Sequence, residues 1–131
     1  MSQTLGFFLC LALTLVFLAA AVWSGLRAKR RVHLLCVTGA LACLALAIER
    51  ALALGTHYDI EAAGWITPVH KWMAKIATAS YLLPVVSGVR TIFHPPTRKL
   101  HRKIAFLVLT LTVLTAITGT WMLLASPRLP D

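Results

Sequence analysis

Four long apolar runs constrain the fold of this 131-residue chain more than any other feature. They cover about residues 5–23, 33–54, 70–93 and 104–125, and each is long enough to cross a hydrocarbon core of about 30 Å. Lipid offers no partner to an open backbone N–H or C=O group, so these runs must be helices. The sequence therefore predicts an all-α integral membrane protein, an up-down bundle of four transmembrane helices forming a single domain over residues 1–131.

The composition excludes two other classes of protein. The chain is 59% hydrophobic and only 13% charged, whereas a soluble domain is about 45–50% apolar and about 25% charged. Disordered chains are poor in large apolar residues, so disorder is excluded as well. The spans leave no length for a separate catalytic domain, and we expect a protein that is not an enzyme on its own.

The basic residues predict the orientation in the membrane. The net charge of +9 comes from 13 Lys and Arg against 4 Asp and Glu. These basic residues lie between apolar runs, so the bilayer surface is a better partner for them than nucleic acid. By the positive-inside rule, the first and third connections are cytoplasmic and both termini lie on the other side of the inner membrane. The two connections contain Arg27, Lys29, Arg30, Arg31, Arg90, Arg98, Lys99, Arg102 and Lys103.

The first run resembles a signal peptide in its Ala19-Ala20-Ala21 segment. No basic residue precedes it, however, and a signal peptide needs a charged n-region. We therefore expect a retained helix.

The five histidines are the most informative polar residues. His33, His70 and His101 each lie at the start of an apolar run. Helical spacing places small or hydroxyl residues on the same face as each of these three, and such residues line helix contacts in membranes. We expect all three to point into the bundle. His33 and His101, with His94, form a predicted inner cluster; His70, with His57, forms an outer one.

Inward histidines in a helical bundle suggest a cofactor site. Neutral imidazole is the commonest protein metal ligand, and axial histidines often hold haem iron. The metal-ligand candidates are His33, His101 and His70, and His94 is a substitute for either member of the inner pair. The cofactor is haem b, copper or none. In the competing interpretation the histidines lie at headgroup depth and face water and lipid phosphate.

A charged pair, Glu49-Arg50, lies within the second run. Ionisable residues at such depth are costly and usually point inward or toward water. Arg50 shares the helical face of His33 and is expected to point toward the outer cluster, where His70, Tyr81 and Arg50 form a candidate quinone site. The alternative is that Arg50 snorkels to the interface. In the third run, Pro84 is expected to kink the helix and free a carbonyl.

The second half of the chain resembles a known membrane family. The residues that carry the resemblance are His70-Lys-Trp-Met-Ala, Pro84, Arg90, His101-Arg-Lys-Ile-Ala and Thr118-Gly119, with a looser match at His33. They are similar to a small four-helix family, catalogued as a domain of unknown function, that is linked to maturation of haem-copper terminal oxidases. The resemblance covers residues 31–124. A weaker similarity is to four-helix b-type membrane cytochromes, in which histidines from two helices clamp haem, a role that His33 and His101 would fill here.

These observations lead to one hypothesis and two alternatives. The leading hypothesis is a respiratory-chain-associated membrane protein that binds haem or a metal through inward histidines. It would act in electron transfer or in terminal oxidase assembly. The alternatives are a non-catalytic accessory subunit that packs against other membrane protein subunits, and a small quinone-reactive subunit.

Overall fold

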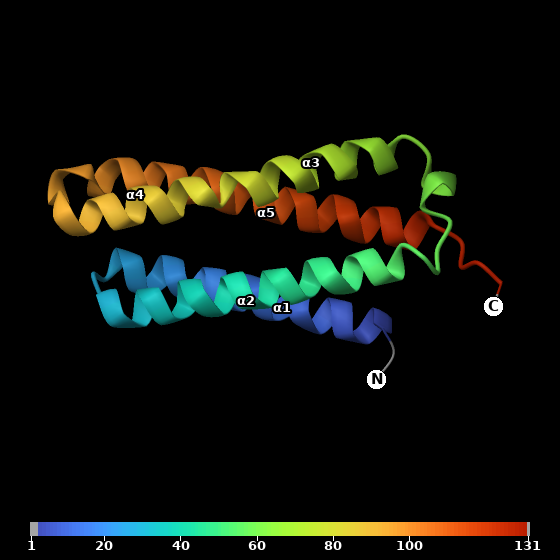
Figure 1. Ribbon diagram of the computed structural model, residues 1–131, viewed down its shortest axis with the longest axis horizontal. Helices are drawn as coiled ribbons and strands as arrows, with labels where there is room; N and C mark the ends of the chain where they lie inside the picture. The colour runs from blue at the N-terminus through green and yellow to red at the C-terminus, as the bar shows by residue number, and fades with distance from the viewer. Residues whose placement is uncertain (1–2, 131) are drawn as a thin grey trace. The chain divides into compact units, whose positions relative to one another are not determined.

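The computed structural model describes residues 3–130, and every regular element within them is helical (Figure 1). Four helical stretches are long and apolar enough to cross a membrane. The protein is thus the all-α bundle of four membrane-spanning helices that the apolar runs predict. The elements are α1 (Gln3–Leu26), α2 (Arg30–Leu54), η1 (Ile60–Ala63), α3 (Ile66–Ser80), α4 (Leu82–Phe93), η2 (Pro95–Thr97) and α5 (Arg98–Ala125).

The single domain expected over residues 1–131 has two compact parts. The first unit comprises residues 1–59 and 128–131 and contains the hairpin of α1 and α2. The second unit comprises residues 60–127 and contains α3, α4 and α5. In the second unit, α5 packs against α3 along one part of its length and against α4 along another. Each unit is described by itself below.

Small side chains bring α1 and α2 together. On α1 the buried residues are Gly6, Thr14, Ala21 and Ser24, and on α2 they are Ala40, Ala47 and Leu54. The seven-residue spacing of Ala40, Ala47 and Leu54 keeps one face of α2 in the contact. Small residues allow two backbones to approach closely, which is how helices associate in lipid. Gly39 is an example, because a Cβ atom there would lie 3.0 Å from the ring of Phe17.

The third span is interrupted at Tyr81, between α3 and α4. Pro84 follows three residues later and has no N–H to donate to the carbonyl of Ser80, which closes the preceding helix. The predicted disturbance by Pro84 therefore takes the form of a break at Tyr81. The hydroxyl of Ser80 donates to the Ala77 carbonyl across 2.7 Å, so polar groups next to the break are bonded locally.

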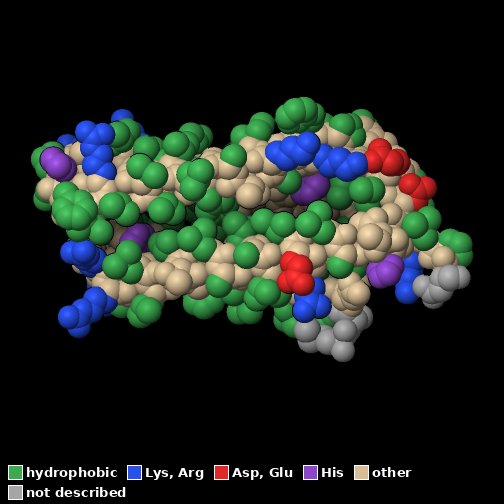
Figure 2. All heavy atoms as spheres, viewed as in Figure 1, with side chains coloured by type: hydrophobic (Ala, Val, Ile, Leu, Met, Phe, Trp, Pro, Cys, Tyr) green, Lys and Arg blue, Asp and Glu red, His purple; other side chains and the backbone are tan. Residues whose placement is uncertain are grey.

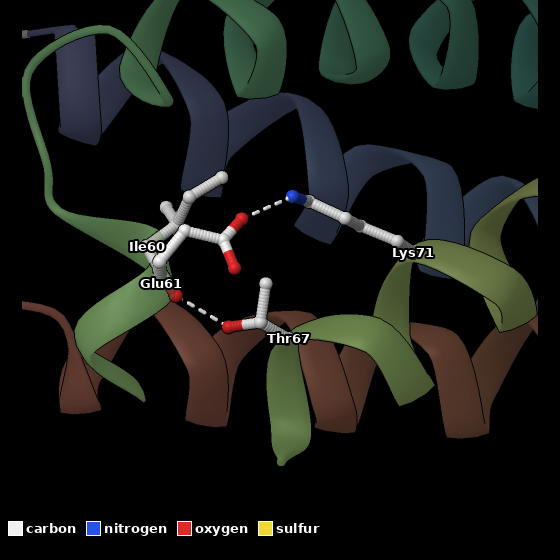
Figure 3. A network of polar contacts seen from close by, with 4 residues as sticks. All are labelled: Ile60, Glu61, Thr67 and Lys71. Carbon is white, nitrogen blue, oxygen red and sulfur yellow. Dashed lines mark hydrogen bonds and ion pairs between the residues drawn. The ribbon is translucent and has the colours of Figure 1, made fainter. Parts of the chain in front are cut away.

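Polar contacts order the loop that precedes α3 (Figure 3). The Thr67 hydroxyl donates to the carbonyl of Ile60 in η1. Lys71, one turn further along α3, donates to the Glu61 carboxylate with an Nζ–Oε1 distance of 2.5 Å. In the first unit, the end of the chain is held to the loop after α2: the Leu129 N–H donates to the His57 carbonyl across 3.0 Å. Both loops are thus fixed by hydrogen bonds to their own unit.

Candidate histidine sites

His33 lies in the first turns of α2 and is half-buried against α1. Its Nδ1 atom is 2.8 Å from the carbonyl oxygen of Ala21. A carbonyl can only accept a hydrogen bond, so Nδ1 must be the donor, and in the neutral ring Nε2 then carries the lone pair. The ring packs on Gly25, where a Cβ atom would lie 3.0 Å from Nδ1.

His101 holds the same kind of position in the second unit, near the start of α5. Its Nδ1 atom lies 2.9 Å from the hydroxyl of Ser87 on α4. The same hydroxyl lies 3.3 Å from the Pro84 carbonyl, and when it donates to that carbonyl it accepts from the imidazole. The ring packs on Gly88, where a Cβ atom would lie 3.2 Å from Cε1.

His70 repeats the arrangement between α3 and the far part of α5. Its Nδ1 atom lies 3.2 Å from the Thr118 hydroxyl. Thr118 donates to the carbonyls of Leu114 and Thr115, at 3.0 and 3.1 Å, and therefore accepts from His70. The ring packs on Gly119 so closely that a Cβ atom there would lie 2.7 Å from Cε1.

The three histidines thus share one local chemistry. Each is half-buried, each packs on a glycine of a neighbouring helix, and each has Nδ1 hydrogen-bonded to an oxygen atom. A hydrogen bond from one ring nitrogen determines which nitrogen remains as base or ligand. Metal-binding histidines characteristically donate their second N–H in this way, which orients the ring. Within their own units, His33 and His70 therefore have the arrangement that ligation through Nε2 requires, and His101 has it when Ser87 donates to Pro84.

The other two histidines differ from these three. His94 ends α4 and is exposed; its carbonyl accepts both the backbone N–H and the hydroxyl of Thr97. His57 lies in the loop after α2 and is also exposed. Within either unit, no three His, Cys, Asp or Glu side chains of residues 3–130 are grouped as a metal site.

The residues of the expected quinone site have different surroundings. Tyr81 is half-buried, and its hydroxyl lies 2.7 Å from that of Thr112 on α5. His70 and Tyr81 are eleven residues apart, which corresponds to roughly 16 Å along an ideal helix. Arg50 is exposed, whereas Ala47, one turn before it on the same face, is buried. The face of α2 that carries His33 buries its small residues against α1 but leaves its arginine outside that contact.

The structure also reveals polar features that the sequence interpretation passed over. Lys71 and Lys75 lie within the third span, and the Nζ atom of Lys75 stacks on the Trp72 ring, 5.1 Å from its centroid. The sequence does contain a signal for these features, because lysines are unusual within an apolar run. The glycines under the histidines gave no such signal, because their partners lie 8, 13 and 49 residues away in sequence.

Comparison with known proteins identifies no family: no family model, no curated protein and no solved structure matches this chain.

Proposed function

We propose that this protein binds haem or a metal ion through Nε2 of inward-facing histidines and acts in electron transfer or in terminal oxidase assembly. One observation carries the proposal. His33 and His101 each lie in the first turns of a helix, half-buried, with Nδ1 hydrogen-bonded to an oxygen atom. A neutral imidazole that donates from Nδ1 has Nε2 as its ligating nitrogen, which is the arrangement that histidine ligands of a metal or haem use.

The residues next to these histidines suit haem b. Arg30 and Arg31 precede His33, and Arg102 and Lys103 follow His101. Charged side chains of this kind neutralise propionates through strong hydrogen bonds. Haem held by these histidines would supply reversible one-electron chemistry. The chain's own part is to orient the rings: Ser87 holds His101, and the Ala21 carbonyl holds His33.

In this proposal the protein lies in the inner membrane, with its basic connections in the cytoplasm and both termini on the other side. His70 is the third candidate ligand and copper the alternative metal. If no cofactor is bound, the second candidate function is that of an accessory subunit. Such a subunit would use its large exposed apolar side chains, among them Leu35, Leu52 and Leu124 at 72–78% exposure, against other membrane proteins.

The visible spectrum of the reduced, detergent-purified protein tests the proposal. We expect a low-spin haem spectrum that His101→Ala abolishes or converts to high spin, with the protein level unchanged. His57→Ala is the matched control, because this exposed histidine lies in a loop. The haem interpretation is wrong if the purified protein shows no Soret band and none develops when haem is added.

Ser87→Ala separates ligation from packing. The variant keeps His101 but removes the hydroxyl that is hydrogen-bonded to Nδ1. Hydrogen bonding at the second nitrogen tunes a ligand's basicity, so we expect a changed haem midpoint potential with an unchanged haem content. A purely structural histidine would leave the potential where it was.

A further inference from the structure

We propose that the turn between α1 and α2 binds the phosphate headgroup of an anionic phospholipid, through a site built from Trp23, Arg27 and Lys29. The site belongs to the first unit. None of its three residues is a candidate cofactor ligand. Its parts are an aromatic ring, two cations stacked on that ring, and a turn that holds both cations in place.

The two cations converge on one ring. The Arg27 Cζ atom lies 4.6 Å from the centroid of the Trp23 ring, and the Lys29 Nζ atom lies 4.9 Å from the same centroid. Both basic residues are exposed, and Trp23 is 46% exposed. Stacking on a ring face attracts each cation to the tryptophan, but it also holds two like charges near each other. An anion between or beside them would relieve that repulsion.

The backbone of the turn accounts for this convergence. Ala28, between the two cations, has a φ of 54° and thus a left-handed conformation that is unusual for a residue with a side chain. The turn is closed by hydrogen bonds from the Lys29 N–H to Ser24 and from the Ala28 N–H to Gly25. These bonds end α1 in the manner of a Schellman motif. They fix the backbone on both sides of Ala28, from which the Arg27 and Lys29 side chains reach the Trp23 ring.

No acidic side chain in α1, in the turn or in most of α2 can neutralise Arg27 and Lys29. Residues 1–48 contain no Asp or Glu. The Lys and Arg side chains gather at the end of the hairpin where this turn lies (Figure 2). The turn follows an apolar helix of 24 residues that is long enough to span a membrane. Such a position is at the level of the lipid headgroups, where tryptophan is enriched and anionic lipids attract basic residues. A phospholipid phosphate is therefore the anion that this site meets.

A second pair of basic residues, both lysines, provides a matched control. Lys71 and Lys75 are exposed basic residues on α3, and Lys75 also stacks on a tryptophan, Trp72. Lys71, however, is paired with the Glu61 carboxylate. Lys75 is the lysine that stacks on Trp72, so this ring does not hold two cations in the way that Trp23 does. Removing these two lysines lowers the net charge as much as removing Arg27 and Lys29.

The experiment is a titration of the full-length, delipidated protein with dioctanoyl phosphatidylglycerol, followed by native mass spectrometry. We expect Arg27→Gln with Lys29→Gln to weaken binding about 25-fold, since each basic residue near anionic lipid contributes about fivefold. Lys71→Gln with Lys75→Gln should stay within about twofold of the unmodified protein. Trp23→Leu should weaken binding severalfold without any change of charge, and Trp23→Phe, which keeps an aromatic face, should retain most of it.

Three outcomes would overturn the proposal. If both double variants lose binding equally, net charge alone attracts the lipid. If Trp23→Leu binds as the unmodified protein does while retaining its helical circular dichroism, the aromatic platform has no role. If inorganic phosphate displaces the phosphatidylglycerol at equal concentration, the site takes a free anion and not a lipid.

Discussion

Each of the three half-buried histidines occupies space that only a glycine leaves open. A Cβ atom on Gly25, Gly88 or Gly119 would lie 3.0, 3.2 or 2.7 Å from the imidazole that packs there. Ordinary van der Waals contact begins at about 3.4 Å, so each of these substitutions would displace a ring. Each histidine and its glycine therefore form a closely packed pair.

Gly119→Ala should disturb the His70 site. The new methyl group would force the ring away from Thr118, and we expect a loss of about 1–3 kcal/mol in the free energy of unfolding, as for other overpacked sites. Unfolding in mixed detergent micelles measures this loss. Gly55→Ala is the control, because a Cβ atom there meets only ordinary contacts, 3.4 Å from the Leu52 carbonyl. Equal stability of the two variants would contradict the tight packing of His70 on Gly119.

At the scale of the elements, hydroxyl side chains close hydrogen bonds inside their own helices. Thr14 donates to the Cys10 carbonyl, and Ser24 donates to the Ala20 carbonyl. Thr112 donates to the Val108 carbonyl and shares a second contact with Tyr81. Such bonds remove the cost of an unpaired hydroxyl in lipid. They also let one hydroxyl serve two purposes, since the oxygen still accepts from a neighbouring helix.

The turn between α1 and α2 offers a prediction about element ends. Ala28 is left-handed, a conformation that costs a residue with a Cβ atom roughly 1–2 kcal/mol and that glycine adopts freely. We expect Ala28→Gly to raise the free energy of unfolding by up to about 1 kcal/mol.

Ala45→Gly is the matched control for that change. Ala45 is exposed in the middle of α2, where glycine is unfavourable by about 1 kcal/mol. The two substitutions should therefore shift the unfolding midpoint in opposite directions. A loss of stability in both variants would contradict the left-handed conformation at Ala28.

At the scale of the whole molecule, the distribution of charge sets the expected topology. Nine Lys and Arg residues lie in the first and third connections, while Asp59 and Glu61 are the only charged residues in the loop between α2 and α3. The positive-inside rule then places both basic connections on the cytoplasmic side.

Reporter fusions test this topology directly. Fusions after Gly25 and after Pro96 should report the cytoplasm, and a fusion at Tyr58 should report the opposite compartment. A non-cytoplasmic signal from either basic connection would contradict the orientation. It would leave the four helical spans unaffected, because they depend on length and apolarity alone.

The sequence by itself determined the number and the approximate limits of the membrane-spanning helices. Three of the four expected spans each lie within one observed helix, and the third is covered by α3 and α4, which are separated at Tyr81. Lipid forces the backbone groups of an apolar run to bond within the run. The sequence also determined which helix faces carry small residues. Ala40, Ala47 and Ala77, together with Val108 and Thr112, lie on the predicted faces of His33, His70 and His101, and all five are buried.

Only the tertiary structure decided what the histidines contact and which ring nitrogen each one uses. His33 bonds to a residue 12 positions away and His70 to one 48 positions away, and helical periodicity cannot specify such pairs. The same holds for Arg50, which shares a face with His33 but is exposed. Helical periodicity predicts the direction in which a side chain leaves its own helix. How far the contact with the neighbouring helix extends along that face depends on the packing of the two helices. Hydrogen-bond partners and burial therefore depend on how the helices meet, which spacing along one helix does not contain.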